Sequence, residues 1–153
     1  MNDSQIVWNR IETEEDLAAF VETLGGFHDA CINEISYVSG AYVNANLSMK
    51  PINDIRTVDI LVQRQYRNLT AIVMRFAGLD TLHLAPYDER YTCEILSASM
   101  FWADGLIYWA DEDGQTSGTI EKYEGTWLCA KEMQWCAVDV DMKLQELRRN
   151  QDE

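Results

Sequence analysis

The chain lacks a long apolar run and has few residues of the kinds that catalysis uses. None of its apolar stretches approaches the roughly 20 residues that a membrane-spanning helix needs, and its N-terminus carries no basic region followed by an apolar one. We therefore expect a cytoplasmic protein without membrane contacts. Histidine occurs only at His28 and His83, which leaves few ways to form a nucleophile–histidine–acid triad.

Cysteine is present without the spacing of a metal or redox site. The four residues are Cys31, Cys93, Cys129 and Cys136, and no two of them form a Cys-x-x-Cys pair. We expect them to be reduced and buried, where cysteine behaves as a small apolar side chain. The sequence therefore predicts no metal site and no cofactor.

Positive charge is scarce. Twelve Lys and Arg residues face 26 Asp and Glu residues, which gives a net charge of −14. This balance argues against nucleic acid, because phosphates are bound by Lys and Arg, and against anionic membrane surfaces. It permits a basic protein partner, which charge complementarity would attract. The alternative is that the charge serves only solubility.

The remaining composition is that of an ordinary globular protein. Apolar residues make up 47% of the chain and charged residues 25%, and 153 residues are enough to bury a core. There is no linker and no internal repeat. We expect a single domain over residues 1–153, with a polar C-terminal tail, 139–153, in which Met142, Leu144 and Leu147 allow a frayed helix.

One N-terminal helix is strongly predicted. Thr13 and Asp16 have the spacing of a capping box, and acidic residues fill the first turn, where they suit the helix dipole. Gly25-Gly26 supplies the left-handed backbone that ends a helix. The apolar stripe between these ends consists of Leu17, Phe20, Val21 and Leu24.

The rest of the chain reads as strands joined by short turns. Apolar and polar residues alternate on either side of Arg67-Asn68, and Asp104-Gly105 is a strong hairpin signal. Gly78 is expected to bend the chain into a further strand. The expected strands are 31–39, 41–49, 58–63, 72–77, 79–84, 91–102, 106–110, 120–123 and 127–138.

This order predicts an α+β fold that is mainly β. Consecutive strands usually pair, so we expect a meandering antiparallel sheet with one N-terminal helix at an end or edge. The specific prediction is a β-sandwich or a partly closed barrel.

His28 and Asp29 are the first residues to consider for catalysis, because a carboxylate can orient an imidazole that acts as a general base. Neighbouring residues on an extended chain point apart, however, so this pair is not expected to orient itself. A structural role is the favoured interpretation, since both residues stabilise turns through local hydrogen bonds.

The acidic run at 111–114 is the next candidate, and its pattern excludes a calcium-binding loop. Asp111, Asp113 and Gly114 match part of the EF-hand pattern. Trp109 and Ile120 then stand where the loop needs its first and last carboxylates. A solvated acidic loop is the better interpretation.

The strongest binding signal is an acidic and aromatic stretch. No Lys or Arg occurs from Tyr91 to Glu121. Aromatic anchors beside uncompensated negative charge are typical of an interface for a basic partner; otherwise the aromatic residues belong to the core and the acids are merely solvated. The expected partner-binding residues are Trp102, Asp104, Tyr108, Trp109, Asp111, Glu112, Asp113 and Glu121.

Two short motifs carry a resemblance. Phe27-His28-Asp29-Ala30-Cys31-Ile32 opens a strand, and Ile-Val-Met-Arg-Phe-Ala-Gly-Leu at 72–79 leads into Leu82-His83-Leu84. The span 27–109 resembles small bacterial proteins, similar to some families assigned as immunity proteins of polymorphic toxin systems. The resemblance implies a protein that neutralises a toxin by binding it, with no catalytic or metal residue.

The leading hypothesis is therefore a non-enzymatic cytoplasmic binding protein, of which an immunity protein that occludes a basic toxin is one form. A second hypothesis is a small-ligand-binding or hydrolytic β-domain with a site near His28, Asp29 or His83. A third is a self-associating module, a homodimer formed through exposed aromatic residues or a sheet edge.

Overall fold

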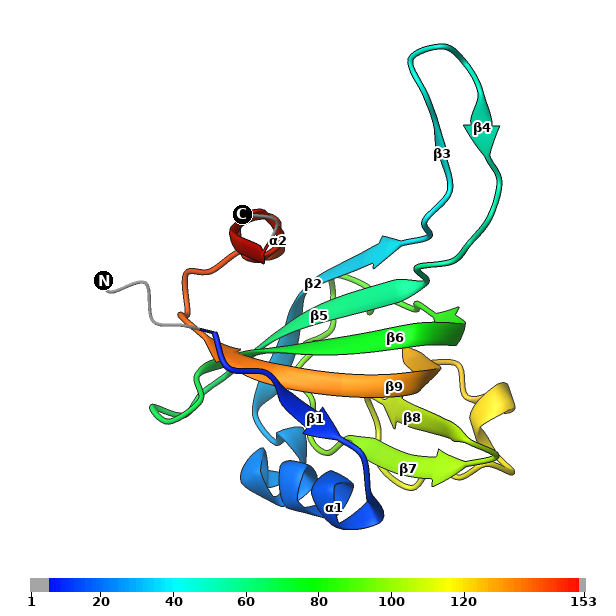
Figure 1. Ribbon diagram of the computed structural model, residues 1–153. Coiled ribbons are helices and arrows are strands. Elements are labelled where there is room, and N and C mark those ends of the chain that lie inside the picture. Colours follow the sequence, from blue (N-terminus) through cyan, green and yellow to red (C-terminus); the bar gives the residue numbers. More distant parts are fainter. Residues whose placement is uncertain (1–5, 152–153) are drawn as a thin grey trace.

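The protein is described by a computed structural model that covers residues 6–151 (Figure 1). It is mainly β, with one helix near each end of the described chain. The helices are α1, Glu14–Thr23, and α2, Leu144–Gln151, with 3-10 turns η1, Gly25–Phe27, and η2, Ile120–Lys122. The strands are β1, Asn9–Ile11; β2, Ala30–Val38; β3, Tyr42–Val43; β4, Met49–Lys50; β5, Thr57–Arg64; β6, Ala71–His83; β7, Ser99–Ala103; β8, Leu106–Ala110; and β9, Trp127–Val138.

Helix α1 begins where its sequence predicts. The Thr13 hydroxyl accepts from the Asp16 backbone N–H at 3.0 Å, and the Asp16 carboxylate accepts from the Thr13 N–H at 3.2 Å. This is the reciprocal capping box. After the helix, Gly25 and Gly26 have φ of +58° and +68°, so the left-handed ending is also confirmed.

Seven strands form one antiparallel sheet in the order β2-β5-β6-β9-β8-β7, with β1 also paired to β9. Two meanders, β2-β5-β6 and β9-β8-β7, meet where β6 pairs with β9 along its whole length. The sheet is open, because β2 and β7 are its outer strands and do not pair. The predicted antiparallel sheet is confirmed, and its specific form is a single open sheet rather than a sandwich or a partly closed barrel.

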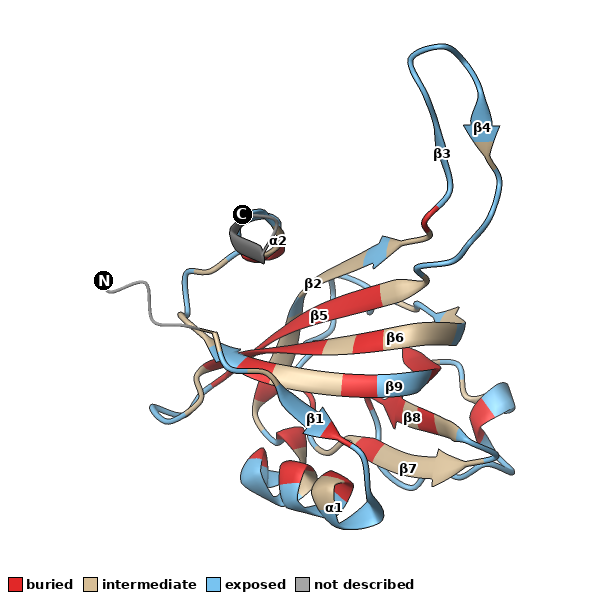
Figure 2. Cartoon of the chain, viewed as in Figure 1, coloured by how far each residue is buried: buried red, intermediate tan, exposed pale blue. Residues whose placement is uncertain are grey.

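A helix on each face takes the place of a second sheet. On one face, Leu17 and Phe20 of α1 and Leu24 directly after it belong to the same core cluster as Val58, Ile60 and Met74 of the sheet. On the other face, Leu144 and Leu147 of α2 pack against Leu61 and Val73. Figure 2 shows the buried residues concentrated in the central strands. The predicted C-terminal helix is therefore a docked element; residues 152 and 153 of the predicted tail lie outside the described residues.

Four strand predictions differ from the structure. Strand β6 continues past Gly78, which takes φ of +67° next to an irregularity in register, in place of the expected bend. Of the predicted strand 91–102, only β7 forms, and most of 84–97 is irregular. The predicted strand 120–123 is the 3-10 turn η2, and the predicted strand 41–49 is a hairpin of β3 and β4.

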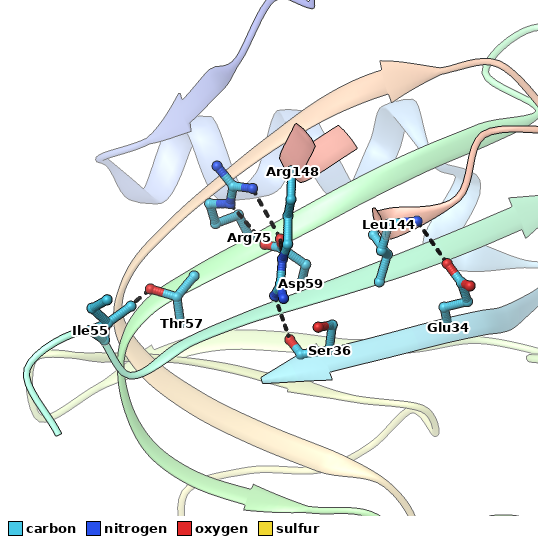
Figure 3. A network of polar contacts seen from close by, with 8 residues as sticks. All are labelled: Glu34, Ser36, Ile55, Thr57, Asp59, Arg75, Leu144 and Arg148. Atoms are coloured by element: carbon cyan, nitrogen blue, oxygen red, sulfur yellow. Dashed lines mark hydrogen bonds and ion pairs between the residues drawn. The ribbon is translucent and has the colours of Figure 1, made fainter. Parts of the chain in front are cut away.

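A buried ionic network fastens α2 to the sheet (Figure 3). Asp59 is only 1% exposed, and Arg75 donates to both its oxygens at 2.8 and 3.0 Å. Arg148 of α2 adds a contact of 3.5 Å to the same carboxylate and donates to the Ser36 carbonyl at 3.4 Å. The Glu34 carboxylate accepts from the backbone N–H of Leu144 at 2.9 Å. Two guanidinium groups therefore compensate the charge of Asp59.

All four cysteines are free thiols. Cys129 and Cys136 are buried as predicted, and burial raises the pKa of the Cys136 thiol to about 12. Cys93 is exposed and Cys31 partly so, which corrects the prediction for these two. No helix within residues 6–151 has the length and apolar character needed to cross a membrane.

Candidate functional site

A cleft opens on the α1 face of the sheet, beside the outer strand β2. Its volume is about 240 Å³. Ile32 and Ile35 of β2 form one wall and the irregular segment 84–95 forms the other, with Asp111 as the acidic group. The complete lining is Ile32, Ile35, Leu84, Ala85, Pro86, Tyr87, Cys93, Ile95, Asp111 and Thr126.

A second hollow of about 410 Å³ adjoins the first, sharing Tyr87 and Asp111 with it. Its rim carries the carboxylates Glu94, Glu112 and Asp113, which are exposed. We call the two hollows together the Asp111 cleft. It combines apolar walls with negative charge.

Asp111 lies directly after β8 and is 7% exposed. Its backbone N–H donates to the Thr126 carbonyl at 3.1 Å, and its carboxylate accepts from the Tyr123 hydroxyl. Burial raises the pKa of Asp111, although hydrogen bonds that the carboxylate accepts from the Tyr123 hydroxyl and from the backbone of Thr126 and Asp111 act to lower it. Among the ion pairs of the described residues, none involves Asp111. It is a buried carboxylate without a counter-charge, in contrast to Asp59.

Hydrogen bonds from two hydroxyl groups hold the cleft walls in place. Thr126 Oγ1 accepts from the Ala85 N–H at 3.0 Å and lies 3.3 Å from the Ala85 carbonyl. Ser99 Oγ donates to the Glu112 carbonyl at 2.6 Å and accepts from the Gln115 N–H at 3.1 Å. The cleft is therefore formed before any ligand arrives, which lowers the cost of binding.

The electrostatics of the cleft disfavour further negative charge. The pKa of Tyr87 is raised by burial and by the carboxylates of Asp111 and Glu112. Burial and Asp111 likewise raise the pKa of Tyr123. A cation in the cleft would interact favourably with the same carboxylates.

The predicted acidic and aromatic surface does not form one patch. Trp109 is 0% exposed and packs against Phe27 at 5.8 Å between ring centroids, so it belongs to the core and its prediction as a binding residue is wrong. Alternation places Tyr108 on the opposite face, stacked on Phe101 at 4.8 Å. Asp104 and partly exposed Trp102 lie at the other end of the β7–β8 hairpin from Asp111.

Asp111, Glu112 and Asp113 are brought together at the cleft, while exposed Glu121 lies in η2. No sequence pattern indicates Tyr87, Ile95, Tyr123 or Thr126 as residues of this site. Tyr87 and Ile95 lie in the irregular segment 84–97, where no periodic pattern indicates which side chains face inward. Their role follows only from the packing of that segment against β2.

His28 and Asp29 do interact, contrary to the argument from an extended chain. Phe27 and Asp29 have φ of +67° and +60°, so the backbone is not extended, and the His28 Nδ1 to Asp29 Oδ2 distance is 3.0 Å. Both side chains are at least one-third exposed. The Nδ1 of His83 lies 2.7 Å from the Gly125 carbonyl oxygen. His83 is the last residue of β6, whereas His28 precedes the start of β2, which lies near the first residues of β6. The two histidines therefore do not share a site.

Within residues 6–151 there is no group of three or more His, Cys, Asp or Glu side chains that could hold a metal ion. Comparison of the chain with protein-family models, curated proteins and solved structures gives no match.

Because Asp111 has no ion pair among the described residues, it should make the free energy of unfolding depend on pH. Because its pKa is raised in the folded state, its contribution to stability is complete below the ordinary Asp pKa of about 3.9 and is lost as pH rises through the folded pKa. Asp111→Asn removes this loss and can still accept from Tyr123. We therefore expect the stability of the variant relative to wild type to increase with pH over this window. Urea unfolding of both proteins from pH 4 to pH 7 measures the difference, and a flat difference would contradict it.

Proposed function

We propose that the protein is a non-enzymatic binding protein whose Asp111 cleft receives a lysine or arginine side chain of a basic protein partner. One observation carries this proposal: Asp111 is 7% exposed and lines a preformed cleft, without an ion pair among the described residues.

The physical argument starts from the cost of burying charge. An ionised carboxylate removed from water is strongly unfavourable unless a cation and hydrogen bonds compensate it. On the other face of the sheet, Arg75 and Arg148 compensate Asp59. Asp111 has only hydrogen bonds. A cation supplied by a partner would complete the site.

The walls of the cleft suit the rest of such a side chain. Lysine and arginine carry an apolar stem that packs along apolar surfaces while the charged head finds polar partners. Ile32, Ile35 and Pro86 offer that apolar surface. Tyr87, which is exposed at the cleft, offers an aromatic ring to a cation.

The rim would guide a basic partner to the cleft. Glu94, Glu112 and Asp113 surround Asp111, and the whole chain carries a net charge of −14. Such a field accelerates encounter with a positively charged protein and selects against acidic ones. Together with the resemblance to immunity proteins, this favours a basic toxin in the cytoplasm as the partner, neutralised by occlusion.

The test is affinity capture from a lysate of the encoding organism, with wild type, Asp111→Asn and Asp104→Asn immobilised in parallel. Asp104 is an exposed turn residue at the other end of the hairpin, and asparagine tolerates its φ of +53°. We expect wild type and Asp104→Asn to retain one basic protein that salt releases. Asp111→Asn should bind it about 2–5 kcal/mol more weakly, as measured by calorimetry with the purified partner.

Two outcomes would contradict the proposal. One is that no basic protein is retained by wild type at low salt. The other is that Asp111→Asn binds the retained protein as tightly as Asp104→Asn does, which would remove the cleft from the interface.

A further inference from the structure

A hairpin arm, residues 41–56, projects from the sheet beyond the ends of β2 and β5 (Figure 1). Its two strands share only the pairs Tyr42–Lys50 and Val43–Met49. Six of its large apolar side chains are between 49% and 83% exposed. They are Tyr42, Val43, Leu47, Met49, Ile52 and Ile55.

Local contacts give the arm a defined shape. The Asn44 N–H donates to the Ser48 carbonyl at 2.8 Å, and the Asn44 side-chain amide donates to the Ser48 hydroxyl at 3.0 Å. Lys50 pairs with Asp54 at 2.7 Å and lies 5.6 Å from the centre of the Tyr42 ring. An ordered arm that exposes contiguous apolar side chains is typical of an interaction surface.

The arm emerges beside an open sheet edge. Among the described residues, β2 pairs with β5 alone, apart from a single bridge between Ala30 and Ile95. The part of β2 from Glu34 to Val38 has regular register. Its single carboxylate, Glu34, accepts a hydrogen bond from α2. One guanidinium also lies at this segment, since Arg148 of α2 donates to the Ser36 carbonyl at 3.4 Å. No other charged side chain of β2 projects between Glu34 and Val38 to oppose edge-to-edge pairing.

Charge indicates which molecule would cover these surfaces. No Asp or Glu occurs from Ile35 to Asn53. In the arm Lys50 and Asp54 cancel, which leaves Arg56, whose guanidinium donates to the Leu79 carbonyl at 3.5 Å. Two copies of a chain with net charge −14 repel each other over most of their surfaces. Along β2 and the arm they can approach without that repulsion, so this surface of low charge fits a second copy.

We propose that the protein forms a homodimer in which the β2 edges of two copies pair antiparallel around a two-fold axis. Because Ala30 is already bridged to Ile95, the segments Glu34–Val38 pair with each other, which places Val38 of one β2 beside Glu34 of the other and the axis near Ser36 and Tyr37. The arm, which begins just after Val38, is thereby carried onto the second copy and covers its apolar side chains there. Each copy contributes the same surface, as a two-fold interface requires.

The test is sedimentation velocity of the full chain from about 1 to 100 μM, a range in which dimers of moderate affinity form. We expect wild type to sediment at twice the 17.6 kDa chain mass. Val43→Asp/Leu47→Asp/Met49→Asp should be monomeric, because three charges then enter the contact. Tyr37→Lys should weaken the dimer at least tenfold at low salt, because its two lysines lie near the axis.

Val140→Asp is the matched control, since Val140 is 55% exposed and lies outside the proposed contact. It should remain dimeric. All variants should keep the wild-type far-UV circular dichroism spectrum, because the changed residues are exposed. A wild type that is monomeric throughout, or a dimer that survives the triple substitution, would overturn the proposal. The dimer edge shares Ile35 with the wall of the Asp111 cleft, but none of the substituted residues lines the cleft, so this proposal and the proposed function fail separately.

Discussion

Asp59→Ala is expected to lower the free energy of unfolding by about 3–5 kcal/mol, because removing one partner of a buried ion pair leaves the other charge uncompensated. Arg75 would lose two hydrogen bonds while its side chain remains only 18% exposed. The guanidinium also lies 4.4 Å from the centre of the Trp8 ring, and this cation–π contact does not replace a carboxylate. Urea unfolding measures the loss.

The control for this prediction is Glu121→Gln. Glu121 is exposed and has no ion pair among the described residues, so its substitution should change stability by no more than about 0.5 kcal/mol. A loss below about 1 kcal/mol for Asp59→Ala would mean that water reaches the network and screens it.

A double-mutant cycle then separates the role of α2. The Arg148 contact with Asp59 is long, at 3.5 Å, and the Arg148 side chain is partly exposed. Arg148→Ala alone should therefore lower the free energy of unfolding by less than Asp59→Ala does. Because both residues belong to one network, the two losses should not add. Hydrogen exchange of α2 in each variant would show whether the network holds the helix against the sheet.

Elements defined by local chemistry were predictable from the sequence. The capping box of Thr13 and Asp16 and the turn at Asp104-Gly105 need only neighbouring residues, and both are present as expected. The long alternating strands were equally clear. The irregular path of the segment 84–97 could not be predicted from the sequence. Its bridge to the sheet joins Ile95 to Ala30, 65 positions earlier in the chain, and a local pattern does not show such a contact.

The candidate site was only partly predictable, because it too depends on contacts between residues that are far apart in the chain. The acidic run 111–113 is visible in the sequence, but the burial of Asp111 depends on residues from several loops, among them Thr126 and Tyr87. Alternation puts Tyr108 and Trp109 on opposite faces. Both are aromatic, so the pattern does not show which face is the core.

Trp109→Ala is the second large effect that we expect, a loss of about 3–5 kcal/mol in the free energy of unfolding. Trp109 is 0% exposed and packs in the main core, in contact with the Phe27 ring. Its removal leaves a large cavity beneath α1. Trp102→Ala is the comparison, and its smaller loss should reflect a partly exposed position. Urea unfolding of both variants measures the difference, and equal losses would contradict the assignment of Trp109 to the core.

A different pair of variants, Trp109→Phe and Asp111→Asn, separates stability from binding. Because Trp109 contacts the core and not the solvent, the conservative replacement Trp109→Phe should bind the proposed partner of the Asp111 cleft as wild type does, at a temperature where the variant is folded. Asp111→Asn should show the reverse, with stability kept and binding lost. Reduced binding by fully folded Trp109→Phe would show that the core beneath the cleft sets its shape, and the assignment of recognition to Asp111 and its rim would then be incomplete.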